Sequence, residues 1–397
     1  MPSGIKTSIS TSITSYRPYL HEGLTFTLQK KYKVKTILVS GASIAGLATA
    51  YWMDQLGYKV TVVEVAPAPR TGGTAVDLRL GTIDVLKRMG IYEQVKANAL
   101  NLELVEFKNA ADETVGSFAQ NRFNNEEEIE IERTILVGVL YNALKNKVNF
   151  LFNNSITALH ETTNNITATF KDGSQSTFDF VVGCDGTHSN VRKIWFGPEA
   201  DYAYFLNAYF SISIVEKSLV APNTVNFYNT PGKAYMLNAY KNKTDVIFCF
   251  AADEEIEYDY RNVNQQRKII LEQFTGQQWR TAELLSEVAN SENFYFDKFC
   301  QIKMPSWSKG RVVLVGDAAY CPSPAAGMGG SLALDGAAAL ADALKVHKEN
   351  YKSAFQDYEN NLRPFIESVQ ADAEINAREK FIPRTQEAID QRNMEGF

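Results

Sequence analysis

The chain has 397 residues, of which 45% are hydrophobic and 22% are charged, the balance of a globular protein with a large core. Its net charge of -6 and its pI near 5.5, without a basic stripe, exclude nucleic acid as the main partner. No apolar run reaches the roughly 18 residues that a membrane-spanning helix requires. This length predicts two domains, or one large domain with an inserted lobe.

Structure is expected to begin after residues 1–33, a Ser/Thr-rich stretch that we interpret as a poorly ordered extension or as the product of an early start codon. The apolar run Thr36–Val39 predicts a buried parallel strand, and Ile44–Leu56 has the apolar spacing of a helix. A second strand, Val60–Val63, ends at Glu64. Together these segments form a βαβ unit of the size that opens a dinucleotide-binding domain.

The middle of the chain contains both helical apolar spacing and the alternation typical of strands. Residues 77–100 contain a helical pattern, and residues 101–131 alternate as strands. A helix is expected over Arg133–Leu144, followed by strands in residues 148–186 with a hairpin turn at Lys171–Gly173. Residues 200–300 alternate again, which predicts an antiparallel sheet, with a helix near Gln265–Phe274.

In the last third, the continuous apolar run Val312–Val315 again predicts a buried parallel strand, and the chain is expected to be helical after Ala337. The sequence therefore predicts an α/β protein. A Rossmann-like domain would comprise residues 34–105, 130–200 and 300–345, and an inserted antiparallel-sheet lobe residues 106–129 and 201–299. A C-terminal helical segment would follow over residues 346–397.

The cysteines and histidines are few and widely spaced. Cys184, Cys249, Cys300 and Cys321 form no CxxC pair, so we expect neither a disulfide framework nor a zinc site, and a reducing cytoplasm fits. The four histidines are never paired at ligand spacing, which argues against a metal centre.

The first candidate site is the turn Gly41-Ala-Ser-Ile-Ala-Gly46, between the first strand and helix. Gly41 would allow the tight turn and Gly46 a close approach of helix to strand, so that the helix N-terminus faces a pyrophosphate. Ser43 stands where the usual GxGxxG motif has its middle glycine, and its hydroxyl could donate to phosphate. Glu64 would accept hydrogen bonds from ribose hydroxyls.

Two further apolar strands end on an aspartate beside a glycine. Asp185-Gly186 follows one, although an aspartate that merely caps the next helix would give the same pattern. Asp317 follows the other and could hold a ribose or ribityl hydroxyl. The amides of Gly327–Ser331 then open a helix whose positive end suits a phosphate or an anionic ring edge. The small residues around them leave room for a planar cofactor: Ala325, Ala326, Gly327, Gly329 and Gly330.

These three motifs, in this order and separation, resemble the FAD-dependent aromatic hydroxylases, the group A flavin monooxygenases. Their fold has a glutathione-reductase-type FAD domain with an inserted substrate domain. Within that family, GASIAGLATAYWMDQLGYKVTVVE, RTGGTAVDLR and SWSKGRVVLVGDAAYCPSP resemble the tetracycline-inactivating enzymes. The resemblance implies a monomeric enzyme with FAD, NADPH or NADH as reductant, O₂ and an aromatic or polyketide-like substrate, which would confer tetracycline resistance.

The resemblance also implies roles for individual residues. Glu64 would bind the adenosine ribose, Arg70 matches an arginine assigned to NADPH, and Asp185 and Asp317 would hold the pyrophosphate and ribityl region. For Arg70 and Arg133 a surface ion pair is the alternative. The full set of candidate cofactor contacts is Gly41, Ser43, Ala45, Gly46, Glu64, Arg70, Asp77, Arg133, Asp185, Asp317, Pro324, Gly327, Gly329 and Gly330, and no catalytic side chain is expected.

The chain departs from the family pattern at three positions. Tyr320 stands where histidine is common, Met328 replaces the glutamine of a GQG turn, and Val65 replaces an arginine after the ribose-binding acid. The substrate would lie between the inserted sheet and the flavin. Candidate lining residues are Phe227, Tyr228, Met236 and Tyr240, although strand alternation sends half of such a set to the core. A flavin oxidoreductase without oxygen transfer and an FAD-containing sequestering protein are the alternatives.

Overall fold

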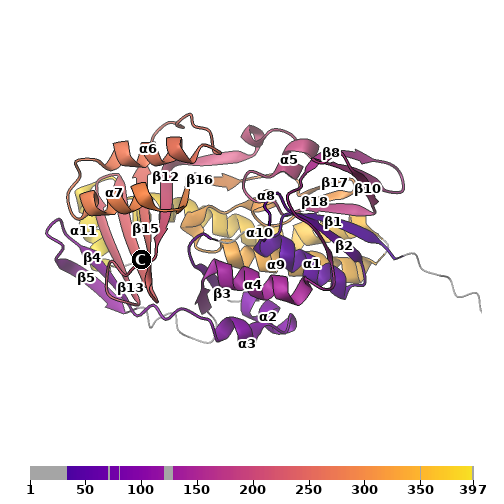
Figure 1. Ribbon diagram of the computed structural model, residues 1–397, viewed down its shortest axis with the longest axis horizontal. Coiled ribbons are helices and arrows are strands. Elements are labelled where there is room, and N and C mark those ends of the chain that lie inside the picture. The colour runs from indigo at the N-terminus through magenta and orange to yellow at the C-terminus, as the bar shows by residue number, and fades with distance from the viewer. Residues whose placement is uncertain (1–33, 70–71, 80, 120–127, 349, 396–397) are drawn as a thin grey trace, which may run out of the picture. The chain divides into compact units, whose positions relative to one another are not determined.

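The computed structural model describes residues 34–69, 72–79, 81–119, 128–348 and 350–395. The predicted extension, residues 1–33, lies outside the described residues. The described chain contains two large sheets, each with helices packed on it, and two small antiparallel sheets (Figure 1).

The first large sheet has six strands in the order β17, β18, β11, β1, β2 and β7. All its neighbouring strands are parallel except for the β17–β18 pair. The strands are β1 (Thr36–Ser40), β2 (Lys59–Val63), β7 (Asn149–Leu151), β11 (Phe180–Gly183), β17 (Ser308–Lys309) and β18 (Val312–Leu314). Ile37, Leu38 and Val39 are fully buried, as expected for a central strand covered on both faces.

Helix α1 (Ile44–Gln55) follows β1 and packs against α4 (Arg133–Leu144) and α9 (Gly329–His347). The long α10 (Tyr351–Asn376) lies along α9. The buried face of α9 is rich in alanine and glycine, so neighbouring backbones can approach it closely. Shorter helices of this part are α2 (Gly81–Arg88), α3 (Tyr92–Lys96), α5 (Asn190–Trp195), α8 (Asp317–Tyr320) and the turns η2 (Glu199–Asp201) and η3 (Pro324–Ala326).

The second large sheet has seven strands in the order β16, β12, β15, β14, β13, β4 and β5. They are β4 (Leu104–Lys108), β5 (Thr114–Ala119), β12 (Ala203–Val215), β13 (Thr224–Thr230), β14 (Lys233–Tyr240), β15 (Lys243–Ala251) and β16 (Asn293–Ile302). All pairs are antiparallel except β4–β13. Helices α6 (Val263–Phe274) and α7 (Thr281–Asn290) cover one face (Figure 1).

The other face of this sheet meets α10 and η3, because Phe210, Ile247 and Phe299 form one apolar cluster with Ala325 and Ala373. We call it the inner face. The π-helical segment η4 (Ala377–Phe381) follows α10, and α11 (Gln386–Glu395) lies near β5 and β13. The small sheets are β8 (Ile156–Glu161), β9 (Ile166–Phe170) and β10 (Gln175–Phe178), and the ribbon of β3 (Val76–Arg79) with β6 (Glu128–Ile131).

The predicted elements are confirmed in kind, including the opening βαβ unit, the helix over Arg133–Leu144 and the hairpin between β9 and β10. The start of the segment predicted to be helical from residue 77 is different: Val76–Arg79 forms strand β3. The reason is non-local, since β3 pairs with β6, some fifty residues later. The four cysteines are buried free thiols, and no helix among the described residues is long and apolar enough to span a membrane.

Candidate functional site

The turn between β1 and α1 depends on its two glycines. Gly41 has φ +103°, and a Cβ there would lie 2.5 Å from the Cys184 carbonyl oxygen. A Cβ on Gly46 would lie 1.9 Å from the Gly41 carbonyl oxygen. Any side chain at either position would therefore collide with backbone. The glycines bring the N-terminus of α1 against the ends of β1 and β11.

Glu64 lies at the carboxyl end of β2 and is almost fully buried. One carboxylate oxygen accepts a hydrogen bond from Ala42 N at 2.7 Å, and the other accepts one from Ala66 N at 2.9 Å. This aligns the acid with the glycine turn. Val65, the next residue, is 65% exposed.

Arg133, the first residue of α4, connects several of the predicted elements. Its guanidinium donates to Ser43 Oγ at 2.8 Å. A Cβ on Gly73 would lie 3.3 Å from the Arg133 side chain. Its positive charge also acts on Asp317, because it opposes the rise that burial causes in the pKa of that carboxyl. Three segments far apart in sequence therefore meet at one cation.

Asp317 directly follows β18 and begins α8. Gly316, before it, has φ +69°, and a Cβ there would lie 3.0 Å from the Ala45 side chain. The late aspartate is thus positioned beside the first turn of α1. Burial raises its pKa above the ordinary range, which favours hydrogen bonding with a hydroxyl over exposure as a free charge.

Asp185 serves as a cap in this structure, which was the alternative considered for it. Its carboxylate accepts hydrogen bonds from Ser189 Oγ at 2.5 Å and Val191 N at 3.0 Å, at the start of α5. Ser40 Oγ, from β1, donates to it at 3.4 Å. Burial raises its pKa. The cap still lies beside the glycine turn, because Cys184 is the residue that Gly41 approaches.

The start of α9 faces the β3–β6 ribbon. Gly327 has φ +61°, and a Cβ there would lie 3.5 Å from Asp77 Oδ2. A Cβ on Gly330 would lie 3.1 Å from Val76 Cβ, so this glycine permits the close approach of helix and strand. Gly329 and Pro324 are exposed. Arg70, the candidate NADPH contact, lies outside the described residues.

The four candidate substrate residues divide between the two faces of the seven-stranded sheet. Phe227 and Met236 are direct cross-strand neighbours on the inner face, and Tyr240 has the same strand parity as Met236. Tyr228 lies on the opposite face, where its ring packs against Tyr235 and Trp279 beneath the covering helices. Tyr228 is therefore a core residue and is withdrawn as a substrate contact.

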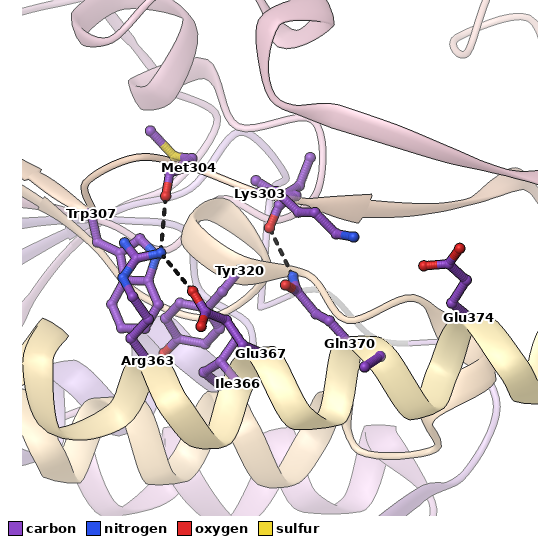
Figure 2. A pocket seen from close by; sticks show the side chains of 11 residues that line it. Lys303, Met304, Trp307, Tyr320, Arg363, Ile366, Glu367, Gln370 and Glu374 are labelled. Atoms are coloured by element: carbon purple, nitrogen blue, oxygen red, sulfur yellow. Dashed lines mark hydrogen bonds and ion pairs between the residues drawn. The ribbon is translucent and has the colours of Figure 1, made fainter.

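Tyr320 also belongs to a core and not to the glycine turns. Its ring packs 4.5 Å from the Trp307 ring, and Tyr358 Oη donates to its oxygen at 3.1 Å. Tyr320 lines a cavity of about 300 Å³ between the segment after β16 and helix α10 (Figure 2). Two of the polar groups there pair with backbone: Arg363 donates to the Met304 carbonyl, and Gln370 to the Ile302 carbonyl.

Several polar residues near the site were not predicted from the sequence. Arg79 forms ion pairs with Asp77 and Glu128, and Thr74 Oγ1 donates to Asp245 on the inner face at 2.5 Å. The signal was present in part, because Asp77 and Arg79 alternate, as do Glu128 and Glu130. Period-two alternation would have placed each pair on one face of a strand.

Comparisons with known proteins agree with this arrangement. Residues 33–373 match the family described as "FAD binding domain". A relative from Mycobacterium tuberculosis, an uncharacterized protein, is 36% identical over 346 residues, covering 85% of this chain and 92% of that protein. A flavin-dependent monooxygenase of Legionella longbeachae is 33% identical, covering 84% of this chain and 86% of that protein.

Among solved structures, the tetracycline destructase Tet(51) superposes with a TM-score of 0.81 at 34% identity. The match covers 91% of this chain and 95% of that one. The chain therefore belongs to the FAD-binding-domain family of flavin-dependent monooxygenases. The resemblance drawn from the three motifs, and the α/β fold that it implied, are confirmed.

Proposed function

We propose that this FAD-dependent monooxygenase uses NADPH or NADH and O₂ to hydroxylate an aromatic or polyketide-like molecule, and that tetracyclines are among its substrates. The observation that carries the proposal is the 34% identity to a tetracycline destructase across 91% of the chain. Oxidation of the antibiotic would inactivate it, so a cell that makes the protein would become resistant.

The described residues fit FAD. The glycine turn at Gly41 and Gly46 brings the N-terminus of α1 beside the Glu64 carboxylate and the Arg133 guanidinium. In the proposal, the N–H groups at the start of α1 and the Arg133 guanidinium bind the pyrophosphate. Glu64 binds the adenosine ribose, and Asp317 binds the ribityl chain. Asp185 supports the turn from behind, where its carboxylate accepts hydrogen bonds from Ser189 Oγ and Val191 N.

When bound, FAD would supply electron transfer and oxygen activation, which side chains cannot perform. The protein's contribution is position and charge. The N-terminus of α9, with its exposed Gly329, offers the positive end of a 19-residue helix to a negatively charged ring edge. Phe227, Met236 and Tyr240 would form one wall of the substrate site and keep water out.

The proposal is tested with purified, FAD-loaded protein and a panel of tetracyclines, phenols and polyketides. We expect substrate-dependent oxidation of NADPH or NADH and a product heavier by one oxygen atom in mass spectrometry. Nicotinamide oxidation without such a product would instead indicate an oxidoreductase that transfers no oxygen. Tight binding of a tetracycline without turnover would indicate sequestration. Protein that takes up no FAD would contradict every version of the proposal.

The predicted domain division, the monomeric state and a cytoplasmic location remain part of the proposal. In it, residues 34–105, 130–200 and 300–345 bind FAD, and residues 106–129 and 201–299 bind the substrate. Size-exclusion chromatography with light scattering on the purified protein tests the monomeric state.

A further inference from the structure

The β3–β6 ribbon carries its charges on one face. Asp77 pairs directly with Glu130, and Arg79 with Glu128. Because side chains alternate along a strand and direct partners share a face, these four side chains lie on the same side. Leu78, Ile129 and Ile131 point to the other side and are buried in the core of the FAD-binding part. The ribbon thus presents a polar, acid-rich surface away from that core.

The surface opposite is the inner face of the seven-stranded sheet. Asn238 and Asp245 are direct cross-strand partners on β14 and β15, so their side chains share one face. Glu130 receives a hydrogen bond from the Asn238 side chain. Asp77, Glu128, Glu130 and Asp245 therefore gather between ribbon and sheet, and we call them the carboxylate cluster. It lies beside the glycine turn before α9, through Asp77 and Gly327.

The charges in the carboxylate cluster are incompletely balanced. Arg79 pairs with Asp77 and Glu128. Lys241, at the edge, pairs with Glu132. Glu130 is half-buried among carboxylates, and its desolvation, together with Asp77, Asp245 and Glu128, raises its pKa to about 8.

The pKa of Asp245 is likewise raised to about 6, chiefly by burial. The Thr74 and Tyr240 hydroxyls donate to its carboxylate and limit this rise. Like-charged groups held this close destabilise the ligand-free fold unless protons or a cation are present.

An independent observation points to a missing donor. Asn238 is only 6% exposed, and its Oδ1 atom is buried without a hydrogen-bond partner among the described residues. A buried acceptor left without a donor is costly, and native proteins retain few of them. Among the described residues no group of three or more His, Cys, Asp or Glu side chains has the arrangement that holds a metal ion. A cation that carries N–H donors would meet both needs, because its charge balances the carboxylates and its hydrogens reach the unpartnered oxygen.

We propose that Glu130, Asp245 and Asn238 recognise a protonated amine on the substrate. An alkylammonium group provides N–H donors for the two carboxylates and for the free Asn238 oxygen, and its charge balances the cluster. Binding keeps Glu130 ionised and releases its proton to solvent. This inference rests on the proposed function, because the ligand is taken to be the molecule that is oxygenated. It adds that this molecule is a cationic amine.

The test compares ligands that differ only in the amine. FAD-loaded protein is titrated calorimetrically with tetracycline and with its analogue lacking the dimethylamino group. A second pair is a phenol with an aminoalkyl chain and the same phenol with an alkyl chain. We expect the wild type to bind the amine member at least about tenfold more tightly, the effect of one charge-assisted hydrogen bond.

Two variants address the residues themselves. Glu130→Gln removes the charge, and Asn238→Leu removes the unpartnered oxygen; each is expected to abolish the preference for the amine and to leave binding of the amine-free member unchanged. Glu254→Gln, at an exposed position, is the matched control and should keep the preference. Without ligand at pH 9, Glu130→Gln should melt at a higher temperature than the wild type, because it removes a charge that its carboxylate neighbours oppose. A purely structural role for Glu130 would instead lower the melting temperature of this variant.

The outcomes separate this inference from the proposed function. Amine-selective binding without oxygenation would contradict the proposed function and keep the amine site. If both members of a pair bind with equal affinity and both are oxygenated, the proposed function stands and the amine site is contradicted. Lack of an amine preference in both pairs, including failure to bind, overturns the inference, as does a Glu130→Gln variant that retains the preference.

Discussion

At the residue scale, single glycines decide whether the turn between β1 and α1, Gly41–Gly46, can form. At Gly46 a methyl group would lie 1.9 Å from a carbonyl oxygen, and a backbone atom cannot rotate away as a side chain does. At Gly138, within α4, a methyl group would meet nothing within 4 Å. A glycine-to-alanine substitution therefore meets crowded backbone at Gly46 and open space at Gly138, so the second can serve as a control for the first.

We predict that Gly46→Ala destabilises the protein by about 2–3 kcal/mol, because the helix must shift away from β1. It should also purify with much less flavin, since the shift moves the N–H groups proposed to bind phosphate. Thermal melting and the flavin absorbance of the purified protein measure both effects. Gly138→Ala is the control and should stabilise α4 by about 0.5–1 kcal/mol. Full flavin content in Gly46→Ala would contradict the assigned role of the turn.

At the scale of elements, one histidine joins the two large sheets. His188 lies in the turn between β11 and α5, and its ring nitrogens contact Glu199 at 3.0 Å and Asp297, on β16, at 3.1 Å. Burial alone would lower its pKa, but hydrogen bonds to these two carboxylates raise it from 6.5 to about 9. The histidine is therefore protonated at neutral pH and bridges two acids.

This shift makes stability depend on pH in a defined direction. Because the pKa of His188 is higher in the folded state, its contribution is complete below about pH 6.5 and is lost as pH rises through about 9. A rise in pKa from 6.5 to about 9 corresponds to about 3 kcal/mol. We predict that His188→Gln is destabilising near pH 6 and close to neutral near pH 10, as measured by urea unfolding at both values.

The exposed His160 supplies the control for this experiment, since His160→Gln should leave the pH dependence of unfolding as in the wild type. Asp297 keeps hydrogen bonds from Tyr295 and Tyr258 in the His188 variant, so the variant is expected to fold. An identical loss of stability at both pH values would show that His188 acts by packing and not by charge.

At the scale of the whole molecule, cofactor binding should stabilise the fold, because its proposed contacts come from segments spread from Gly41 to Gly330. FAD at a hundredfold excess over its Kd is expected to add about 2.7 kcal/mol to the stability of stripped protein. Asp317→Asn should reduce this gain, while the stripped variant melts no lower than the wild type, since burial already disfavours the Asp317 charge. The exposed Asp342→Asn is the control. An unchanged gain in Asp317→Asn would remove that residue from the FAD site.

Much of the fold could be predicted because its signals are local. The apolar run of β1, the glycines of the following turn and the carboxylate at the end of β2 lie within one short segment, so periodicity and turn chemistry suffice there. Strand β3 could not be predicted in this way, since its partner β6 is distant in sequence. The same holds for Tyr228 and Tyr320, whose aromatic character fits a ligand site and a core equally well.

The sequence by itself determined the class of protein: three glycine-and-acid motifs, each at the end of an apolar strand, are a local property that needs no long-range contact to be recognised. Only the tertiary structure decided which side chains face each other. Arg133 contacts Ser43 and acts on Asp317, and Glu130 contacts Asn238. The partners in each pair are far apart along the chain, and only packing brings them together. The physical reason is that the charge balance of a buried cluster is a sum over neighbours in space, which the order of residues along the chain does not contain.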